Sequence, residues 1–313
     1  MLLLADGAGF AARIAGTGTA PRPVRPADLA GLSPSLLPLF FPGGSPAVAT
    51  DVPGIPWPVT FAVTRAPGSQ FDLLAGIADA PGALPERLLA VAGEGDGFHG
   101  QRGRPWVALA GNLHLVAFAR VDLPAATAVG PLAALPAVSV TEAIDSLPGL
   151  AGRAGIKWVN DVLLEGRKAA GVLARTWTRG DRVTGLLLGI GLDVEATPSV
   201  DDDPLARGVT SLADAASPGP PPSLAAAFRA VARSLAAGLD LLASGGGPEL
   251  VARYRERSVI LGREVLVTPD PLLPGEAADE PIRGRVEEIG DQLELRLAGR
   301  ARPVLRGRLR LLD

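Results

Sequence analysis

Closely spaced strand-like runs between residues 156 and 194 restrict the fold of this chain more than any other feature. The runs are IKWV at 156–159, DVLLEG at 161–166, KAAGVLARTWT at 168–178 and VTGLLLGIGLDV at 183–194. The RGD turn at 179–181 predicts a hairpin between the last two runs. Such a series predicts neighbouring strands of one sheet.

Earlier and later parts of the chain add strands and helices to this sheet. Further strand-like runs are PVTFAVT at 58–64, LLAVAGE at 88–94 and NLHLVAFARV at 112–121. Helical stretches are predicted at 71–80, at 125–148 with interruptions at Pro131 and Pro136, at 220–244 and at 248–258. The pattern predicts an α+β fold in which a mixed β-sheet carries helices on one face.

The two ends of the chain differ from this middle part. Residues 1–57 are rich in Pro, Ala and Gly and predict an irregular lead-in, because dense prolines oppose long helices and central strands. From Leu261 onward, short alternating runs predict a small C-terminal SH3-like β-barrel. We therefore expect three parts: the lead-in 1–57, an α+β domain 58–258 and the barrel 259–313.

Composition excludes several kinds of chemistry. The chain has no cysteine and only two histidines, His99 and His114, so a thiolate nucleophile, a Cys-ligated zinc or a multi-histidine metal site is not expected. Its 30 Lys and Arg against 33 Asp and Glu give a net charge of −3, which predicts no general affinity for nucleic acid or an anionic membrane. Neither a signal peptide nor a membrane span is expected, and we predict a cytoplasmic protein. Catalysis would have to use Lys, Arg, Asp, Glu and backbone amides.

Two segments carry the residues of a recognisable site. The segment IKWVNDVLLEGRKAAGVL at 156–173 resembles the biotin protein ligase signature, in which a Lys-Trp-Pro-Asn-Asp strand turns into a Lys-x-x-Gly strand. The loop QRGRPW with GNLHL, the run GIGLDV and the TSL at 210–212 are similar to further motifs of that family. The resemblance covers about residues 60–313. It suggests a divergent member without an N-terminal DNA-binding domain, since nothing in the lead-in resembles a helix-turn-helix.

The resemblance implies an ATP-dependent biotin protein ligase that forms biotinyl-5'-AMP and transfers biotin to a lysine of a carboxylase carrier domain. Such a reaction brings a carboxylate and the α-phosphate of ATP into contact, and cations must offset their repulsion. Lys168 is suited to bridge the two anions, while Arg102 and Arg104 supply forked donors for phosphate oxygens. Gly100 and Gly103 let the backbone approach the ligand.

The resemblance also assigns roles to other residues. Trp106 would cover the adenine, and the loop 95–110 would order over the reactive adenylate. Asp161 would orient the incoming lysine amine or bind Mg²⁺, and Asn160 would hold it in place. The catalytic residues predicted are Lys168, Asp161 and Arg104. The biotin contacts predicted are Ser69, Gln70, His99, Gly100, Gln101, Gly171 and Gly191, and the ATP contacts are Arg102, Gly103, Arg104, Trp106, Asn160, Lys168 and Asp193.

The sequence departs from the family pattern at several of these positions. His99 and Gln101 stand where the family has loop arginines, which removes two cations near the phosphates. Asp193 replaces an asparagine, and a carboxylate there would repel the triphosphate unless a magnesium ion lay between them. Val159 replaces the signature proline.

Other functions stay open at this point. A lipoate or octanoate ligase or transferase on the same scaffold would share most of these motifs, and a non-catalytic small-molecule-binding protein could have lost turnover through His99 and Gln101. Lys168 could also be an ordinary solvated lysine of a strand. A homodimer is possible for this family, whereas nucleic acid and membrane partners are not expected.

Overall fold

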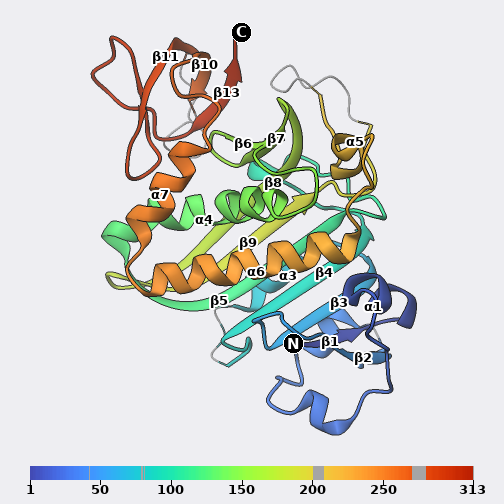
Figure 1. The fold of residues 1–313 in the computed structure, drawn as a ribbon. Helices are drawn as coiled ribbons and strands as arrows, with labels where there is room; N and C mark the ends of the chain where they lie inside the picture. Colours follow the sequence, from blue (N-terminus) through green and yellow to red (C-terminus); the bar gives the residue numbers. More distant parts are fainter. Residues whose placement is uncertain (42, 79, 81, 200–207, 270–279, 313) are drawn as a thin grey trace.

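The computed structural model describes residues 1–41, 43–78, 80, 82–199, 208–269 and 280–312. Nine strands of this described part form one sheet in the order β2-β1-β3-β4-β5-β9-β8-β7-β6 (Figure 1). Their bounds are β1 Leu2–Ala5, β2 Val48–Asp51, β3 Val59–Ala66, β4 Arg87–Gly95, β5 Leu113–Pro124, β6 Ala154–Lys157, β7 Asp161–Leu164, β8 Arg167–Arg179 and β9 Arg182–Leu192. β3 runs parallel to β1 and β4, while the other neighbours are antiparallel. The sheet is mixed, as predicted, and β8 and β9 form the predicted hairpin.

The expectation of an irregular lead-in is wrong for much of residues 1–57. β1 pairs with β3, β2 pairs with β1, and a helix, α1 (Ala8–Ala15), lies between these two strands in the chain. Leu3 and Leu4 are fully buried, in hydrophobic clusters on opposite faces of the sheet. The prolines lie between and beside the two strands, so the short apolar runs are free to extend the sheet.

Four helices of the described part cover one face of the sheet, as predicted (Figure 1). They are α1, α4 (Ala125–Asp145), α6 (Leu224–Ala243) and α7 (Gly247–Glu256). Strand residues at alternate positions, such as Leu89 and Val91 of β4, pack into the same cluster as these helices. Helices α2 (Leu37–Phe40) and α3 (Gln70–Ile77) lie against the opposite face with Leu88 and Ala90.

Helix α4 continues through both of its prolines, which corrects the predicted interruptions at Pro131 and Pro136. A proline inside a helix costs about 3 kcal/mol or more, because it removes a hydrogen bond and crowds the preceding turn. Most residues of α4 are buried against the sheet, α6 and α7, and this packing outweighs the local cost. Among the described helices α4 passes the length and hydropathy test for a membrane span, but 78% of the tested window is buried inside the protein. That burial is typical of a core helix.

A second, smaller sheet follows α7, as predicted for the C-terminal barrel. Its strands in the described part are β10 (Glu264–Pro269), β11 (Ile282–Ile289), β12 (Leu295–Leu297) and β13 (Gly307–Leu311), in the antiparallel order β12-β11-β10-β13. Residues 270–279 and 313 of the predicted barrel lie outside the described residues. The indole N–H of Trp158 donates to the Leu293 carbonyl at 2.7 Å and links the signature segment to this sheet. The short helix α5 (Leu212–Ala216) completes the fold.

Candidate active site

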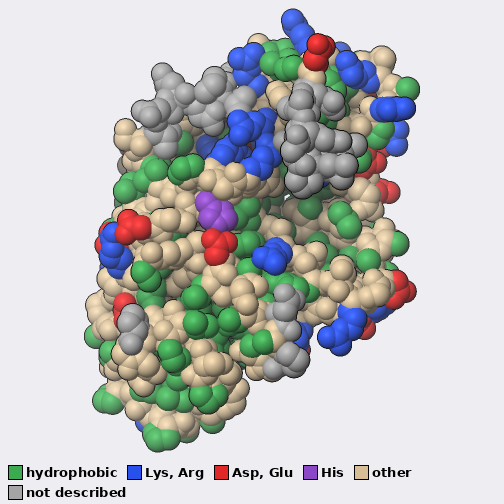
Figure 2. Space-filling model, turned by 180° about the vertical axis from the view of Figure 1, so that it is seen from behind, with side chains coloured by type: hydrophobic (Ala, Val, Ile, Leu, Met, Phe, Trp, Pro, Cys, Tyr) green, Lys and Arg blue, Asp and Glu red, His purple; other side chains and the backbone are tan. Residues whose placement is uncertain are grey.

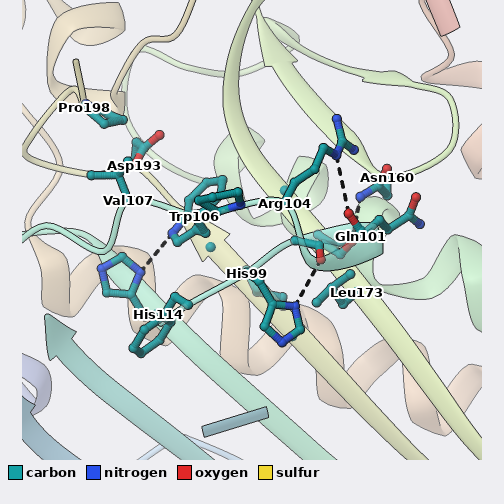
Figure 3. A pocket seen from close by; sticks show the side chains of 18 of the residues that line it. His99, Gln101, Arg104, Trp106, Val107, His114, Asn160, Leu173, Asp193 and Pro198 are labelled. Atoms are coloured by element: carbon teal, nitrogen blue, oxygen red, sulfur yellow. Dashed lines mark hydrogen bonds between the residues drawn. The ribbon is translucent and has the colours of Figure 1, made fainter. Parts of the chain in front are cut away.

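A cavity of about 400 Å³ opens on the sheet face opposite to α4 and α6. Its floor comes from β5, β8 and β9, and the segment 98–107 between β4 and β5 forms a wall (Figure 3). Gly171, Gly189 and Gly191 lie in the floor. Cβ atoms built at these positions would meet the side chains of Phe71 or Trp106, so the glycines let these two rings pack closely on the strands. Seen from this side of the molecule, a histidine and an acidic side chain lie next to a group of Lys and Arg side chains (Figure 2).

Lys168 lies on the cavity wall, as the predicted catalytic role requires. Its Nζ is 2.7 Å from Oδ1 of Asp161, whose Oδ2 is 3.4 Å from Nζ of Lys157. Burial alone would raise the pKa of Asp161, but attraction to Lys168 and Lys157 outweighs it and holds this pKa below its ordinary value. Asp161 is therefore a buried carboxylate that fixes the position of the Lys168 ammonium.

Asp161 does not fit as a magnesium ligand in this arrangement. Its two oxygens face two ammonium groups, and the side chain is only 11% exposed. No cluster of three or more potential metal-binding side chains occurs in the described parts of the chain. The structure also gives Asp161 no place on the cavity wall, so the predicted contact with an incoming amine is not supported.

The loop between β4 and β5 brings some of the predicted arginines to the cavity and not others. Arg104 lines the cavity, and its Nε donates to the Gln101 carbonyl at 3.4 Å (Figure 3). Arg102 and Gly103 lie in a short 3₁₀ turn outside the wall formed by the described residues. Arg104 is therefore the better candidate for a phosphate contact.

His99, Gly100 and Gln101, three of the predicted biotin contacts, line the cavity in the same loop. His99 Nε2 lies 2.8 Å from Oδ2 of Asp72 on α3, and its Nδ1 lies 3.1 Å from the Gly100 carbonyl. The hydrogen bonds to Gly100 and to Asp72 raise the pKa of His99. An imidazole whose pKa is raised therefore stands where the resemblance implies an arginine.

Trp106 packs directly on the glycine floor. A Cβ built on Gly191 would lie 2.4 Å from Cε2 of Trp106, and one on Gly171 would lie 3.3 Å from its Cζ3. The Lys168 ammonium lies 5.6 Å from the centre of the indole ring, within cation–π range. The glycines thus leave space for the side chains of both Trp106 and Lys168.

We expect Gly191→Ala to destabilise the protein by about 1–3 kcal/mol, because the new methyl group would displace the Trp106 indole from a packed position. Urea unfolding measures this change. Gly9→Ala on α1 is the control: a Cβ there meets nothing within 4 Å, and because alanine favours a helix, stability should rise by up to about 1 kcal/mol and not fall. Unchanged stability in Gly191→Ala, together with an unshifted Trp106 indole resonance, would contradict the packing described.

His114 fixes the Trp106 indole through a hydrogen bond, a role that the sequence did not suggest. The indole N–H of Trp106 donates to Nδ1 of His114 at 3.3 Å, so Nδ1 carries no proton (Figure 3). The other ring nitrogen, Nε2, donates to the Leu109 carbonyl at 3.1 Å. Burial lowers the pKa of His114 to about 4, and the ring stays neutral at physiological pH.

The low pKa of His114 predicts a loss of stability in acid. Between the unfolded pKa near 6.5 and the folded pKa of about 4, only the unfolded state binds the proton, so stability falls as pH drops through this window. The free energy of unfolding is lower by about 3 kcal/mol once the pH has reached the folded pKa. Urea unfolding at pH 7.5 and pH 5 gives the free energies of unfolding of wild type and of His114→Asn. The amount by which wild type exceeds the variant should be smaller at pH 5. The control His99→Asn should show the opposite sign, because the pKa of His99 is raised.

Asp193 and Asn160 line the cavity, as the prediction of ATP contacts requires. The Nδ2 of Asn160 donates to the Val172 carbonyl at 2.9 Å, which fixes the turn before Asp161. Asp193 is 1% exposed and accepts a hydrogen bond from Nδ2 of Asn112 at 2.8 Å. Asn112 belongs to the GNLHL segment but was not predicted as a site residue.

The start of α3 contributes Ser69 and Phe71 to the cavity, while Gln70 is turned away from it. Ser69 accepts a hydrogen bond from the Asp72 amide and caps the helix. Gln70 is 3% exposed and shares the buried side of α3 with Leu74, so its predicted biotin contact is not supported. Phe98 and Leu173 also line the cavity. Apolar cavity residues of this kind look like core residues in a sequence and were missed for that reason.

The fold has close counterparts among solved structures. The biotin protein ligase from Aquifex aeolicus, in complex with biotin and ATP, aligns with a TM-score of 0.57 at 17% identity and covers 80% of this chain and 97% of that one. No family model matches the chain. The structural likeness defines the class of fold, that of the biotin protein ligase catalytic domain with a small C-terminal sheet.

Curated relatives extend the likeness to sequence. The biotin--[acetyl-CoA-carboxylase] ligase of Mycobacterium tuberculosis is 31% identical over 243 residues, which cover 76% of this chain and 83% of the relative. The bifunctional ligase/repressor BirA of Bacillus subtilis is 34% identical over 133 residues, 42% of this chain. The match spans about 40% of the length of that Bacillus relative. The chain belongs to the biotin protein ligase family.

Proposed function

We propose that this protein is an ATP-dependent biotin protein ligase, which forms biotinyl-5'-AMP and transfers biotin to a lysine of a carboxylase carrier domain. The observation that supports it most is the position of Lys168. Its ammonium lies on the wall of a glycine-floored cavity, faces Trp106 and is held by a buried carboxylate. A fixed cation in a poorly solvated cavity can stabilise the charge that develops when two anions react.

Two steps make up the reaction. A carboxylate oxygen of biotin attacks the α-phosphorus of ATP, the bond to the β-phosphate oxygen breaks, and pyrophosphate leaves. The uncharged ε-amine of the carrier lysine then attacks the acyl carbon, loses a proton, and AMP leaves. Lys168 neutralises the carboxylate and α-phosphate in the first step, with Arg104 as the second cation on the wall.

The remaining wall residues divide between the two ligands. Trp106 offers an aromatic surface for the adenine, and Asn160 and Asp193 lie where polar groups of the nucleotide would reach. The biotin contacts we propose are Ser69, His99, Gly100, Gln101, Gly171 and Gly191. Asp161 positions Lys168 and touches neither ligand.

We further propose that magnesium arrives with the triphosphate, because the described protein groups do not form a site of their own for it. The protein partner would be a biotin carboxyl-carrier domain, and a homodimer and a cytoplasmic location stay predictions.

Pyrophosphate exchange into ATP, run separately with biotin, lipoate and octanoate, tests the proposal. Exchange that depends on biotin alone is the expected result. Exchange with one of the other acids would assign the protein to acyl-chain ligation instead. An absence of exchange together with tight biotin binding would indicate a binding protein without turnover.

A further inference from the structure

Asp193 is the buried carboxyl group of the cavity that has no cation beside it. It is 1% exposed, and no Lys, Arg or His nitrogen of the described residues lies within ion-pair distance of its oxygens. Asp161, the other buried carboxyl group nearby, has two lysines. The carboxyl group on the cavity wall and the one behind Lys168 therefore have very different electrostatic surroundings.

The hydrogen bond that Asp193 accepts has a fixed direction. Oδ1 of Asn112 accepts from the amides of Val194 and Ala196, both at 3.0 Å, and its Nδ2 donates to the Ala196 carbonyl at 2.8 Å. These bonds prevent the side-chain amide from flipping, so Nδ2 must donate to Oδ1 of Asp193. No donor among the described residues reaches Oδ2 of Asp193, although the residue lines the cavity.

The charged groups on neighbouring elements are either engaged elsewhere or distant from the Asp193 oxygens. Lys168 on β8 attracts Asp193 at long range, but its Nζ is ion-paired with Asp161. Glu195, two residues further along the chain, is paired with Arg13 at 2.5 Å.

The other titratable groups around Asp193 also leave it unpaired. His114 on β5 is neutral, and Arg104 in the loop lines the cavity without an ion pair to Asp193 within the described part. Asp214 on α5 is exposed and accepts from the Thr197 hydroxyl at 2.5 Å.

The ionised form of a buried carboxyl group is disfavoured when it has one amide donor and no cation nearby. Removing a charge from water costs several kcal/mol unless a partner offsets it, and a carboxyl group avoids this cost by keeping its proton. Burial raises the pKa of Asp193 to about 8, and the distant Lys168 offsets only part of this shift.

We propose that Asp193 binds the nucleotide as a neutral carboxylic acid, with its Oδ2–H donating a hydrogen bond into the cavity that holds Lys168. The proposal rests on ATP being the ligand of this cavity. A neutral donor removes the repulsion that a carboxylate would exert on phosphates, and it needs no bridging metal. Deprotonation would turn Oδ2 of Asp193 from a hydrogen-bond donor into part of a negatively charged carboxylate, which would repel the phosphates.

The dissociation constant of ATP as a function of pH tests this, measured by calorimetry between pH 6.5 and 9.5 at constant excess magnesium. Wild-type affinity should fall about tenfold between pH 7 and pH 9, because the neutral, binding-competent fraction falls by that factor. Asp193→Asn, a permanent neutral donor, should bind within about threefold of wild type at pH 7 and show no fall. Asp214→Asn, an exposed carboxyl on α5, is the matched control and should keep the wild-type pH dependence.

A second measurement detects the proton without any ligand. Difference infrared spectra of wild type against Asp193→Asn should show a neutral carboxyl C=O band at pH 7 that disappears near pH 8 to 9. The melting temperature of Asp193→Asn should also exceed that of wild type more at pH 9 than at pH 5, since a raised carboxyl pKa lowers stability as pH rises.

The possible results separate the two proposals. ATP binding without a pH-dependent fall and without the infrared band would overturn the neutral-acid assignment alone. A large loss of ATP affinity in Asp193→Asn at every pH would indicate a carboxylate bridged to magnesium and would also overturn it. The band present at pH 7 with no ATP binding at any pH would refute the proposed function, and the donor role with it.

Discussion

Replacing Lys168 by alanine is expected to lower biotin-dependent pyrophosphate exchange by about a hundredfold to a thousandfold, the effect of losing one aimed charge-stabilising group. The Lys168 ammonium lies on the cavity wall and is held 2.7 Å from Asp161, so it needs no rearrangement when negative charge develops. Alanine removes the charge and leaves Arg104 as the remaining assigned cation. The measurement is the initial rate of exchange at saturating ATP.

Arg167→Ala is the matched control, because Arg167 precedes Lys168 on β8 but is not among the described residues of the cavity wall. It should retain exchange within about threefold. Lys168→Arg keeps the positive charge but cannot keep the geometry beside Asp161, and intermediate activity is expected. If Lys168→Ala folds normally and keeps most of its exchange activity, another group must neutralise the reacting anions.

The sheet of this protein was predictable because its strands are local and strongly patterned. The runs at 156–194 are separated by short turns, and each pairs with its neighbour in the chain. The place of Leu2–Ala5 was not predictable from the same pattern, because its partner β3 begins at Val59 and the proline-rich segment between them obscures the pairing. Burial of α4 against the sheet likewise overrides a proline rule that holds for isolated helices.

The candidate site shows a similar division. Lys168 and two glycines of the floor, Gly171 and Gly191, were predicted, because their motif gives a chemical reason for each residue type. His114 and Phe71 were missed, because a buried ring that supports another ring has the same local pattern as a core residue. The pairing of Asp161 with Lys157 and Lys168 depends on the register of three strands, which no local pattern specifies.

Replacing Asp161 by asparagine should destabilise the protein by about 3–5 kcal/mol at pH 7, because the change removes the buried carboxylate that pairs with Lys157 and Lys168. The side chains of Asp161 and Lys157 are 11% and 6% exposed, and Lys168 is 22% exposed, so solvent screens the remaining charges weakly. Urea unfolding measures the loss. Asp122→Asn, which breaks an exposed pair with Arg182, is the control and should cost less than about 1 kcal/mol.

The pH dependence and a second substitution identify the cause of this loss. The pKa of Asp161 is lowered by its lysines, so its contribution is present above the ordinary carboxyl pKa and disappears as pH falls through the lowered folded value. The difference between wild type and Asp161→Asn should therefore shrink below about pH 4. Adding Lys157→Met to Asp161→Asn removes one of the two positive charges that pair with this carboxylate and should recover part of the stability, whereas a double variant no more stable than Asp161→Asn would mean that charge imbalance does not cause the loss.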